Sequence, residues 1–194
     1  MPASLLEQVE DTASDYEVVQ ELLTEFQLIV DSMEQPQERP SDNQEQREYF
    51  SGKKKRHTFK NQLITLPSGK DIVDVEVGAK GPTSDISLFR QQQQKFSDEQ
   101  KFEGDKAYVG GKKIKTPHKK PRQGELTAQQ KSENHVISSQ RVFGEHVIRL
   151  VKIFRVAQER FRLNPDTYEQ IIFIVCGLVR LRIGALILPV SSQS

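Results

Sequence analysis

Apolar residues recur at spacings of three and four near the start of the chain and then form a continuous short run. The helical spacing over residues 4–26 predicts two short amphipathic helices with a break around residues 12–14. The run that follows, over residues 26–31, predicts a strand that ends at Asp31. Residues 38–52 are polar and contain Pro and Gly, so we expect a loop there.

Alternating apolar and polar positions appear in the next part of the chain. Residues 56–66 and 71–79 both alternate and flank the Pro-Ser-Gly turn at 67–69, which predicts a β-hairpin. Residues 83–85 then offer three candidate N-caps for a helix with a partly apolar face. A further short strand is predicted within residues 101–109.

The C-terminal part has a helical pattern. Residues 125–161 predict a helix whose second half is apolar around most of its circumference, and which we therefore expect to be mostly buried. Asn164-Pro165-Asp166 predicts the start of the last helix. Arg180 and Arg182 interrupt the apolar stretch 171–190 well short of the roughly 20 residues of a membrane span. It is therefore interpreted as a buried terminal helix or helix–strand pair, and the element order predicts an α/β fold with a mixed sheet flanked by helices.

Composition narrows the class of protein. A chain of 194 residues with 35% hydrophobic content suits one ordinary core. The single cysteine, Cys176, excludes an internal disulfide framework, and no signal peptide opens the chain, so a reducing, cytoplasmic location is expected. The first 50 residues carry a net charge of −11 and the remainder +12. This asymmetry indicates a polyanionic partner for the basic part.

Three acids occupy positions where a carboxylate is costly. Asp31 and Asp105 each end a predicted strand, and Glu145 lies in the mostly apolar helix. Burying a carboxylate costs several kcal/mol unless it is paired or bound to a cation, so a shared cation is indicated. Oxygen ligands favour Mg²⁺ or Mn²⁺, and the four histidines and one cysteine lack the spacing of a zinc site.

Basic residues accompany these acids. Arg149 and Lys152 share the helix face of Glu145, although from this stretch alone a structural ion-pair stripe is favoured over phosphate binding. Asp105 heads a run of seven Lys and Arg residues that contains no further acid before Glu125. A solvated charge run is the alternative for each basic cluster, but their position beside two of the acids favours nucleic acid. The candidate DNA-binding residues are Lys53, Lys54, Lys55, Arg56, Lys112, Lys113, Lys115, Lys119, Lys120, Arg149 and Lys152.

Five stretches carry a family resemblance. They are LIVDSMEQPQERP, YFSGKKKRHTFKNQLI, VGAKGPTSDISLF, FEGDKAYVGGKKI and RVFGEHVIRLVKIFRVAQERFR, in this order along the chain. The pattern resembles the DDE superfamily of transposase endonucleases found in bacterial insertion sequences, especially those of cyanobacteria. Taken together, the order and the gaps are far more specific than any one stretch.

The resemblance implies an RNase H-like fold and a catalytic triad of Asp31, Asp105 and Glu145. It also implies a two-metal reaction, with two Mg²⁺ (or Mn²⁺) ions, that cleaves DNA and transfers strands at the ends of the element. Asp31 would bridge both ions, while Asp105 and Glu145 would hold one each. Arg149 and Lys152 would orient DNA phosphates near the ions.

Asp85 matches a further acid of the family, which a His commonly precedes; Ser84 stands there in this chain. We interpret Asp85 as a helix N-cap or as a residue that supports the metal ligands, with direct metal ligation as the less favoured reading.

Members of the family usually begin with a DNA-binding helix-turn-helix region of about a hundred residues. Here Asp31 lies barely thirty residues from Met1, so residues 1–26 are expected to be a helical lead-in and residues 27–190 the DDE endonuclease domain. Besides DNA, the partners considered are a separately encoded N-terminal half and a second copy of the chain. Two alternatives stay open: an idle DNA-binding remnant of an insertion element, and an RNase H-like nuclease unconnected with transposition.

Overall fold

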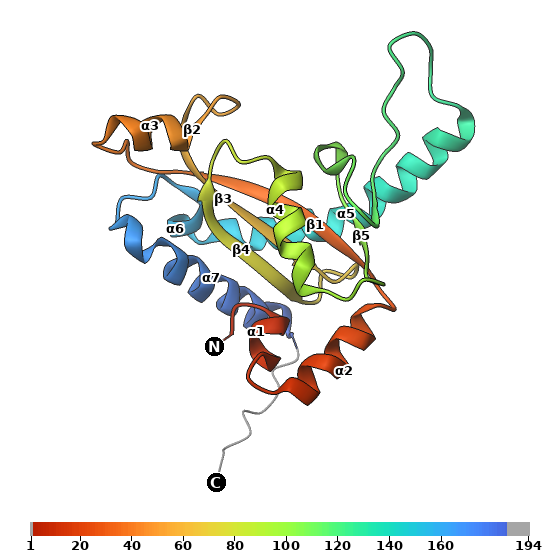
Figure 1. Cartoon of the computed structure of the whole chain (residues 1–194), viewed down its shortest axis with the longest axis horizontal. Coiled ribbons are helices and arrows are strands. Elements are labelled where there is room, and N and C mark those ends of the chain that lie inside the picture. Colours follow the sequence, from red (N-terminus) through yellow and green to blue (C-terminus); the bar gives the residue numbers. More distant parts are fainter. Residues whose placement is uncertain (1, 186–194) are drawn as a thin grey trace.

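A six-stranded mixed sheet forms the centre of the protein, whose computed structural model describes residues 2–185 (Figure 1). Residues 186–190, the end of the expected domain, lie outside the described part. Strands β4, β3, β1, β5 and β6 pair in that order, and the short β2 pairs with β3. The pairs β1–β3 and β3–β4 are antiparallel, whereas β1–β5 and β5–β6 are parallel. The strands span Gln27–Pro36 (β1), Phe50–Ser51 (β2), Arg56–Thr65 (β3), Ile72–Lys80 (β4), Lys101–Glu103 (β5) and Ile114–Lys115 (β6).

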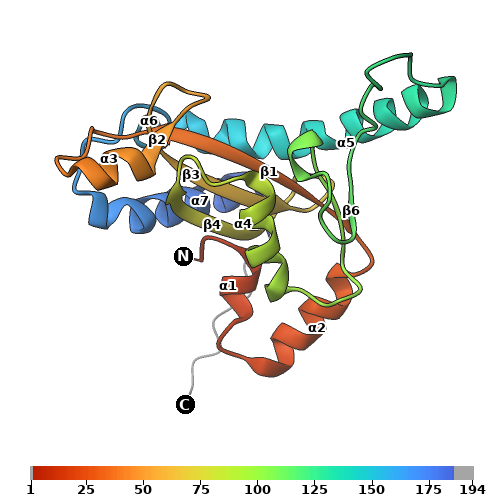
Figure 2. The same cartoon turned by 45° about the horizontal axis from the view of Figure 1, so that its top comes forward.

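Helices cover both faces of this sheet. One face packs against α5 and α7, and the other against α4 and the N-terminal helices (Figures 1 and 2). The predicted α/β, RNase H-like fold class is thereby confirmed. The helices span Leu5–Val9 (α1), Ala13–Leu23 (α2), Asn43–Tyr49 (α3), Asp85–Gln92 (α4), Ala128–Ile153 (α5), Arg155–Gln158 (α6) and Tyr168–Ile183 (α7). Short 3₁₀ turns lie at Gln93–Lys95, Lys106–Tyr108 and Pro165–Thr167.

Three expectations about element boundaries are wrong. Strand β1 does not end at Asp31 but continues to Pro36, because its antiparallel pairing with β3 extends that far. The predicted loop over 38–52 contains α3, which Asp42 caps by accepting from two backbone N–H groups. The predicted helix over 125–161 stops at Ile153, because Phe154 adopts an extended backbone before α6 begins.

A buried ion pair explains one arginine in the apolar C-terminal stretch. Arg180 of α7 donates to both carboxylate oxygens of Asp71 at 2.6 and 3.0 Å, and to the Ser4 carbonyl at 2.9 Å. The residue has no exposed surface, so α7 anchors the N-terminal segment through a fully paired charge. Within residues 2–185 no helix is long and apolar enough to cross a membrane. Cys176 is buried in the same helix, as expected.

The loop before α5 and the first turns of α5 extend away from the sheet (Figures 1 and 2). Asn134 exchanges two hydrogen bonds with the backbone of His118, at 2.7 and 3.1 Å, which fastens the loop to the helix. The His118 ring also contacts Glu133 at 2.6 Å. The basic loop of residues 116–127 is therefore held against α5. Together with the first turns of α5 it forms the projecting arm.

Candidate active site

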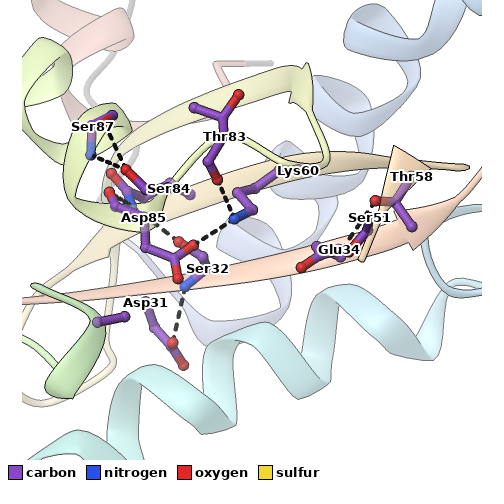
Figure 3. Close-up of polar contacts among 12 residues, drawn as sticks. Asp31, Ser32, Glu34, Ser51, Thr58, Lys60, Thr83, Ser84, Asp85 and Ser87 are labelled. Atoms are coloured by element: carbon purple, nitrogen blue, oxygen red, sulfur yellow. Dashed lines mark hydrogen bonds and ion pairs between the residues drawn. The ribbon is translucent and has the colours of Figure 1, made fainter. Parts of the chain in front are cut away.

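Asp31 lies in the middle of β1 and points toward α5 (Figure 3). Its Oδ1 atom accepts a 2.9 Å hydrogen bond from the Ser32 backbone N–H. Burial raises the pKa of Asp31 from 3.8 to about 6, against the lowering effects of the Ser32 hydrogen bond and the Arg141 charge. The negative charges of Asp105 and Glu145 raise this pKa further. Asp105 and Glu145, the other two predicted catalytic acids, therefore both act electrostatically on Asp31.

Asp105 reaches this region because β5 runs parallel to β1. Strand β5 ends at Glu103, and Asp105 begins the following 3₁₀ turn by accepting a 2.7 Å hydrogen bond from the Ala107 N–H. Ile29 and Glu103 are partners in the β1–β5 ladder, so Asp31 and Asp105 lie two residues further along each chain. The cap fixes one carboxylate oxygen of Asp105 and leaves the other free for a ligand.

Glu145 is positioned by α5, but it is not buried. The expectation of a mostly buried helix is wrong, because only one face of α5 packs against the sheet, and 58% of the Glu145 side chain is exposed. The exposed apolar residues Val142, Phe143 and Ile153 had made the helix look internal. Glu145 instead contacts the Arg141 guanidinium at 3.4 Å, one turn earlier.

Arg141 is a site residue that our sequence interpretation missed. Its side chain is only 17% exposed, and its charge lowers the pKa of Asp31 as well as contacting Glu145. The signal was present, because Arg141 stands four residues before Glu145 on the same helix face. Arg149 and Lys152 lie on the C-terminal side of Glu145, whereas Arg141 lies on its N-terminal side.

The acids fit a hard divalent cation by their chemistry, although they do not form a ready-made site. Within residues 2–185 no three Asp, Glu, His or Cys side chains gather as preformed metal ligands. Asp31, Asp105 and Glu145 nevertheless combine three carboxylates with one nearby arginine, which leaves an excess of negative charge. Carboxylate oxygens are the ligands that Mg²⁺ and Mn²⁺ prefer. Glu145 would have to leave Arg141 to join the other two acids.

Asp85 lies on the opposite side of β1 from Asp31 (Figure 3). The N-cap of α4 is Ser84, which accepts from the Ser87 N–H, so the N-cap interpretation of Asp85 is wrong. Asp85 instead pairs at 3.0 Å with Lys60, whose side chain is only 7% exposed. Its influence on the metal ligands stays a prediction.

The candidate DNA-binding residues form two separate groups. Lys53, Lys54 and Lys55 occupy the exposed turn between β2 and β3, and Arg56 is exposed at the start of β3. This turn lies at the opposite end of the molecule from the projecting arm (Figures 1 and 2). The other group is exposed along the segment around β6 and in the arm: Lys112, Lys113 and Lys115 come before the arm, and Lys119 and Lys120 lie within it. On α5, Arg149 is exposed and Lys152 is half-buried. Of these eleven residues, all of them described, one forms an ion pair: Lys120, with Glu125.

An open cleft of about 1010 Å³ lies near the second group, between the end of α4 and the segment before β6. Arg90, Lys112 and Lys113 line it, but none of the three acids does. The three acids therefore lie outside this cleft, with Asp31 and Asp105 half-buried and Glu145 exposed.

Comparison with known proteins assigns the family. Residues 30–180 match the family model described as DDE superfamily endonuclease. The chain is also 37% identical, over 139 residues, to a protein of Microchaete diplosiphon named as a probable transposase for insertion sequence element IS702. That match covers 70% of this chain and 49% of the relative, so the chain spans about half the length of the curated relative. No solved structure matches the chain. The matched length and the identity together show that this chain belongs to the DDE superfamily of endonucleases.

Proposed function

We propose that the protein is a divalent-metal-dependent endonuclease that cleaves DNA phosphodiester bonds and transfers strands during transposition. The observation that carries the proposal is that carboxylates from distant parts of the chain converge on Asp31: β5 runs parallel to β1 and brings Asp105 to the same region, and the charges of Asp105 and Glu145 both raise the pKa of Asp31. Such an accumulation of like charge is costly without a cation, and it is typical of functional sites.

The three acids share a proposed role. Asp31, Asp105 and Glu145 would together hold two divalent ions, Mg²⁺ or Mn²⁺. When bound, such ions activate a water or a DNA 3′-hydroxyl and stabilise the leaving oxygen in an in-line displacement. Arg149 and Lys152 lie one and two turns beyond Glu145 on α5, where they would hold the phosphates of the scissile strand in place.

The expected partner is DNA at the ends of an insertion element. A separately encoded N-terminal half, which would supply sequence recognition, and a second copy of the chain are further proposed partners. The exposed basic residues of the β2–β3 turn and of the projecting arm support a sequence-independent grip on the DNA backbone.

A second candidate function is DNA binding without cleavage, as in a remnant of a mobile element. It is favoured by the side chain of Glu145, which contacts Arg141 and is not gathered with the other acids. In that case the basic surface would still bind DNA while the three acids stayed idle.

A plasmid-nicking assay separates the two functions. Supercoiled DNA is incubated with the protein and Mg²⁺ or Mn²⁺, and the Asp31→Asn and Asp105→Asn variants are compared with Asp98→Asn, which alters an exposed acid outside the triad. Metal-dependent nicking that both triad variants lose and the control keeps supports the endonuclease. Equal DNA retention by all four proteins, with no nicking by any, supports the remnant.

A further inference from the structure

Glu103, the last residue of β5, is a buried carboxylate with no partner. It is 1% exposed, and among the described residues neither of its carboxylate oxygens has a hydrogen-bond partner. A charged group held in this way costs several kcal/mol, and a neutral side chain of similar size would avoid that cost. Packing alone therefore does not account for a glutamate at this position.

Strand register shows where Glu103 points. It is the ladder partner of Ile29, and a Cβ atom at Gly144 of α5 would lie 2.7 Å from the Ile29 Cγ2 atom. Ladder partners project from the same face of a sheet, so Glu103 lies beneath α5 on the side of Asp31. Arg141 precedes Gly144 on α5 by about one helical turn. Burial raises the pKa of Glu103, and the positive charges of Lys115 and Arg141 lower it.

Arg141 also has a buried polar group without a hydrogen-bond partner, in this case a donor. Its Nε atom is buried without a hydrogen-bond partner in the described part of the chain, while one of its terminal nitrogens contacts Glu145 at 3.4 Å. Arg141 and Glu103 form no ion pair in this state, since the pairs made by the described residues include only Arg141–Glu145 for this arginine. A guanidinium can present its Nε and a terminal nitrogen to one carboxylate in a bidentate pair.

We propose that Glu103 is a positioning residue, the second anchor of Arg141, and that it draws this arginine away from Glu145 and Asp31 when divalent cations bind there. The inference rests on the proposed metal-dependent function. Without metal, Arg141 offsets the charge of the acids. Cation binding would draw Glu145 away from Arg141. The positively charged guanidinium of Arg141 would then lie near a divalent cation and would have no carboxylate partner. The unpartnered oxygens of Glu103 supply that partner, close by and on the same side of the sheet.

The proposal makes metal affinity depend on Glu103 through Arg141. Mn²⁺ binding to the full chain is measured by titration calorimetry for the wild type, Glu103→Gln, Arg141→Gln and the double variant. We expect Glu103→Gln to bind Mn²⁺ about 10-fold more weakly, which is the low end of the loss caused by removing a direct partner of a metal ligand, because Glu103 acts through Arg141. In the Arg141→Gln background the same change should have no further effect. Glu103→Asp, which keeps the charge, should lie between the wild type and Glu103→Gln, and Glu99→Gln is the matched exposed control.

Two results would overturn the inference alone: wild-type Mn²⁺ affinity in Glu103→Gln, or an equal loss with and without Arg141. Thermal melting in EDTA checks that each variant is folded, and removal of a buried charge should not lower the melting temperature. If Glu103→Gln fails to fold, Glu103→Asp carries the same comparison against Arg141→Gln. Absence of Mn²⁺ binding by the wild type would overturn the proposed function, and this inference with it.

Discussion

Gly144 of α5 lies so close to Ile29 of β1 that a Cβ atom at position 144 would be 2.7 Å from the Ile29 Cγ2 atom. Real Cβ atoms do not approach a neighbour that closely, and Ile29 is buried and β-branched, so it cannot easily move aside. The glycine thus permits the approach that brings Arg141 and Glu145 toward Asp31.

Gly144→Ala should therefore destabilise the protein, although alanine favours a helix by roughly 1 kcal/mol over glycine. Overpacking costs typically 1–3 kcal/mol, so we expect a net loss of about 1 kcal/mol and a melting temperature lower by about 2–4 °C. Gly52→Ala is the control, because nothing lies within 4 Å of a Cβ at that position. A variant at 144 that melts at or above the wild-type temperature would show that α5 adjusts without strain.

The sequence predicted the sheet better than it predicted the site. Alternation identified β3 and β4, because each has a patterned run bounded by turn residues. It missed α3, whose sequence NQEQREY lacks an apolar face and which Asp42 stabilises through its cap. The stability of such a polar helix comes from its N-cap and not from the burial of an apolar face.

The three acids were identified from sequence, but their arrangement could not be. Proximity of Asp31 to Asp105 depends on the parallel pairing of β1 with β5, which no local pattern encodes. The exposure of Glu145 depends on which face of α5 meets the sheet, and its exposed apolar residues concealed that face. Glu103 could not be identified from the sequence, because what distinguishes it is its burial and its lack of hydrogen-bond partners in the folded chain.

Asp31 should make the stability of the metal-free protein depend on pH. Its pKa is raised in the folded chain from 3.8 to about 6, so the folded state holds a proton over a range where the unfolded state has lost it. The free energy of unfolding contributed by this group therefore falls as pH rises from about 4 to 6, by on the order of 2 kcal/mol, and stays low above pH 6. Asp31→Asn should remove this fall and be more stable than the wild type at pH 7.5 in EDTA.

Thermal melts in EDTA between pH 4.5 and 7.5 measure this difference, with Asp98→Asn as the exposed control. Mg²⁺ added at pH 7.5 should raise the melting temperature of the wild type but not that of Asp31→Asn, because a ligand stabilises only the state that binds it. Parallel pH curves for the wild type and Asp31→Asn would contradict the expected effect of burial.

Asp85→Asn distinguishes a structural role from metal ligation. The change leaves the Lys60 ammonium, 7% exposed, without its carboxylate partner, so we expect a loss of about 2–3 kcal/mol in the free energy of unfolding. The rise in melting temperature on addition of Mg²⁺ should persist, because Asp85 lies across β1 from Asp31. Glu48→Gln, which breaks the more exposed pair with Lys80, should leave the melting temperature unchanged. Loss of the Mg²⁺ response in Asp85→Asn, with stability retained, would instead indicate a metal ligand.

The two basic groups should contribute separately to DNA binding, because one lies in the turn between β2 and β3 and the other lies beside β6, on different segments of the fold. Lys53, Lys54 and Lys55 form no ion pair among the described residues, and neither do Lys112 and Lys113, so each is free to meet a phosphate. Triple alanine substitution of the first set should lower the slope of log affinity against log salt by about 2–3, and double substitution of the second by about 2.

Fluorescence anisotropy with a long duplex, of about 40 base pairs at 3.4 Å per pair, measures these slopes. The losses should add in the combined variant, since sites far apart contribute independently. Lys70→Ala, an exposed lysine in the β3–β4 turn, is the matched control and should keep the wild-type slope. If a set of lysines can be removed with no change in slope, that set is solvated surface charge, and the DNA path across the three acids must be sought along the other set.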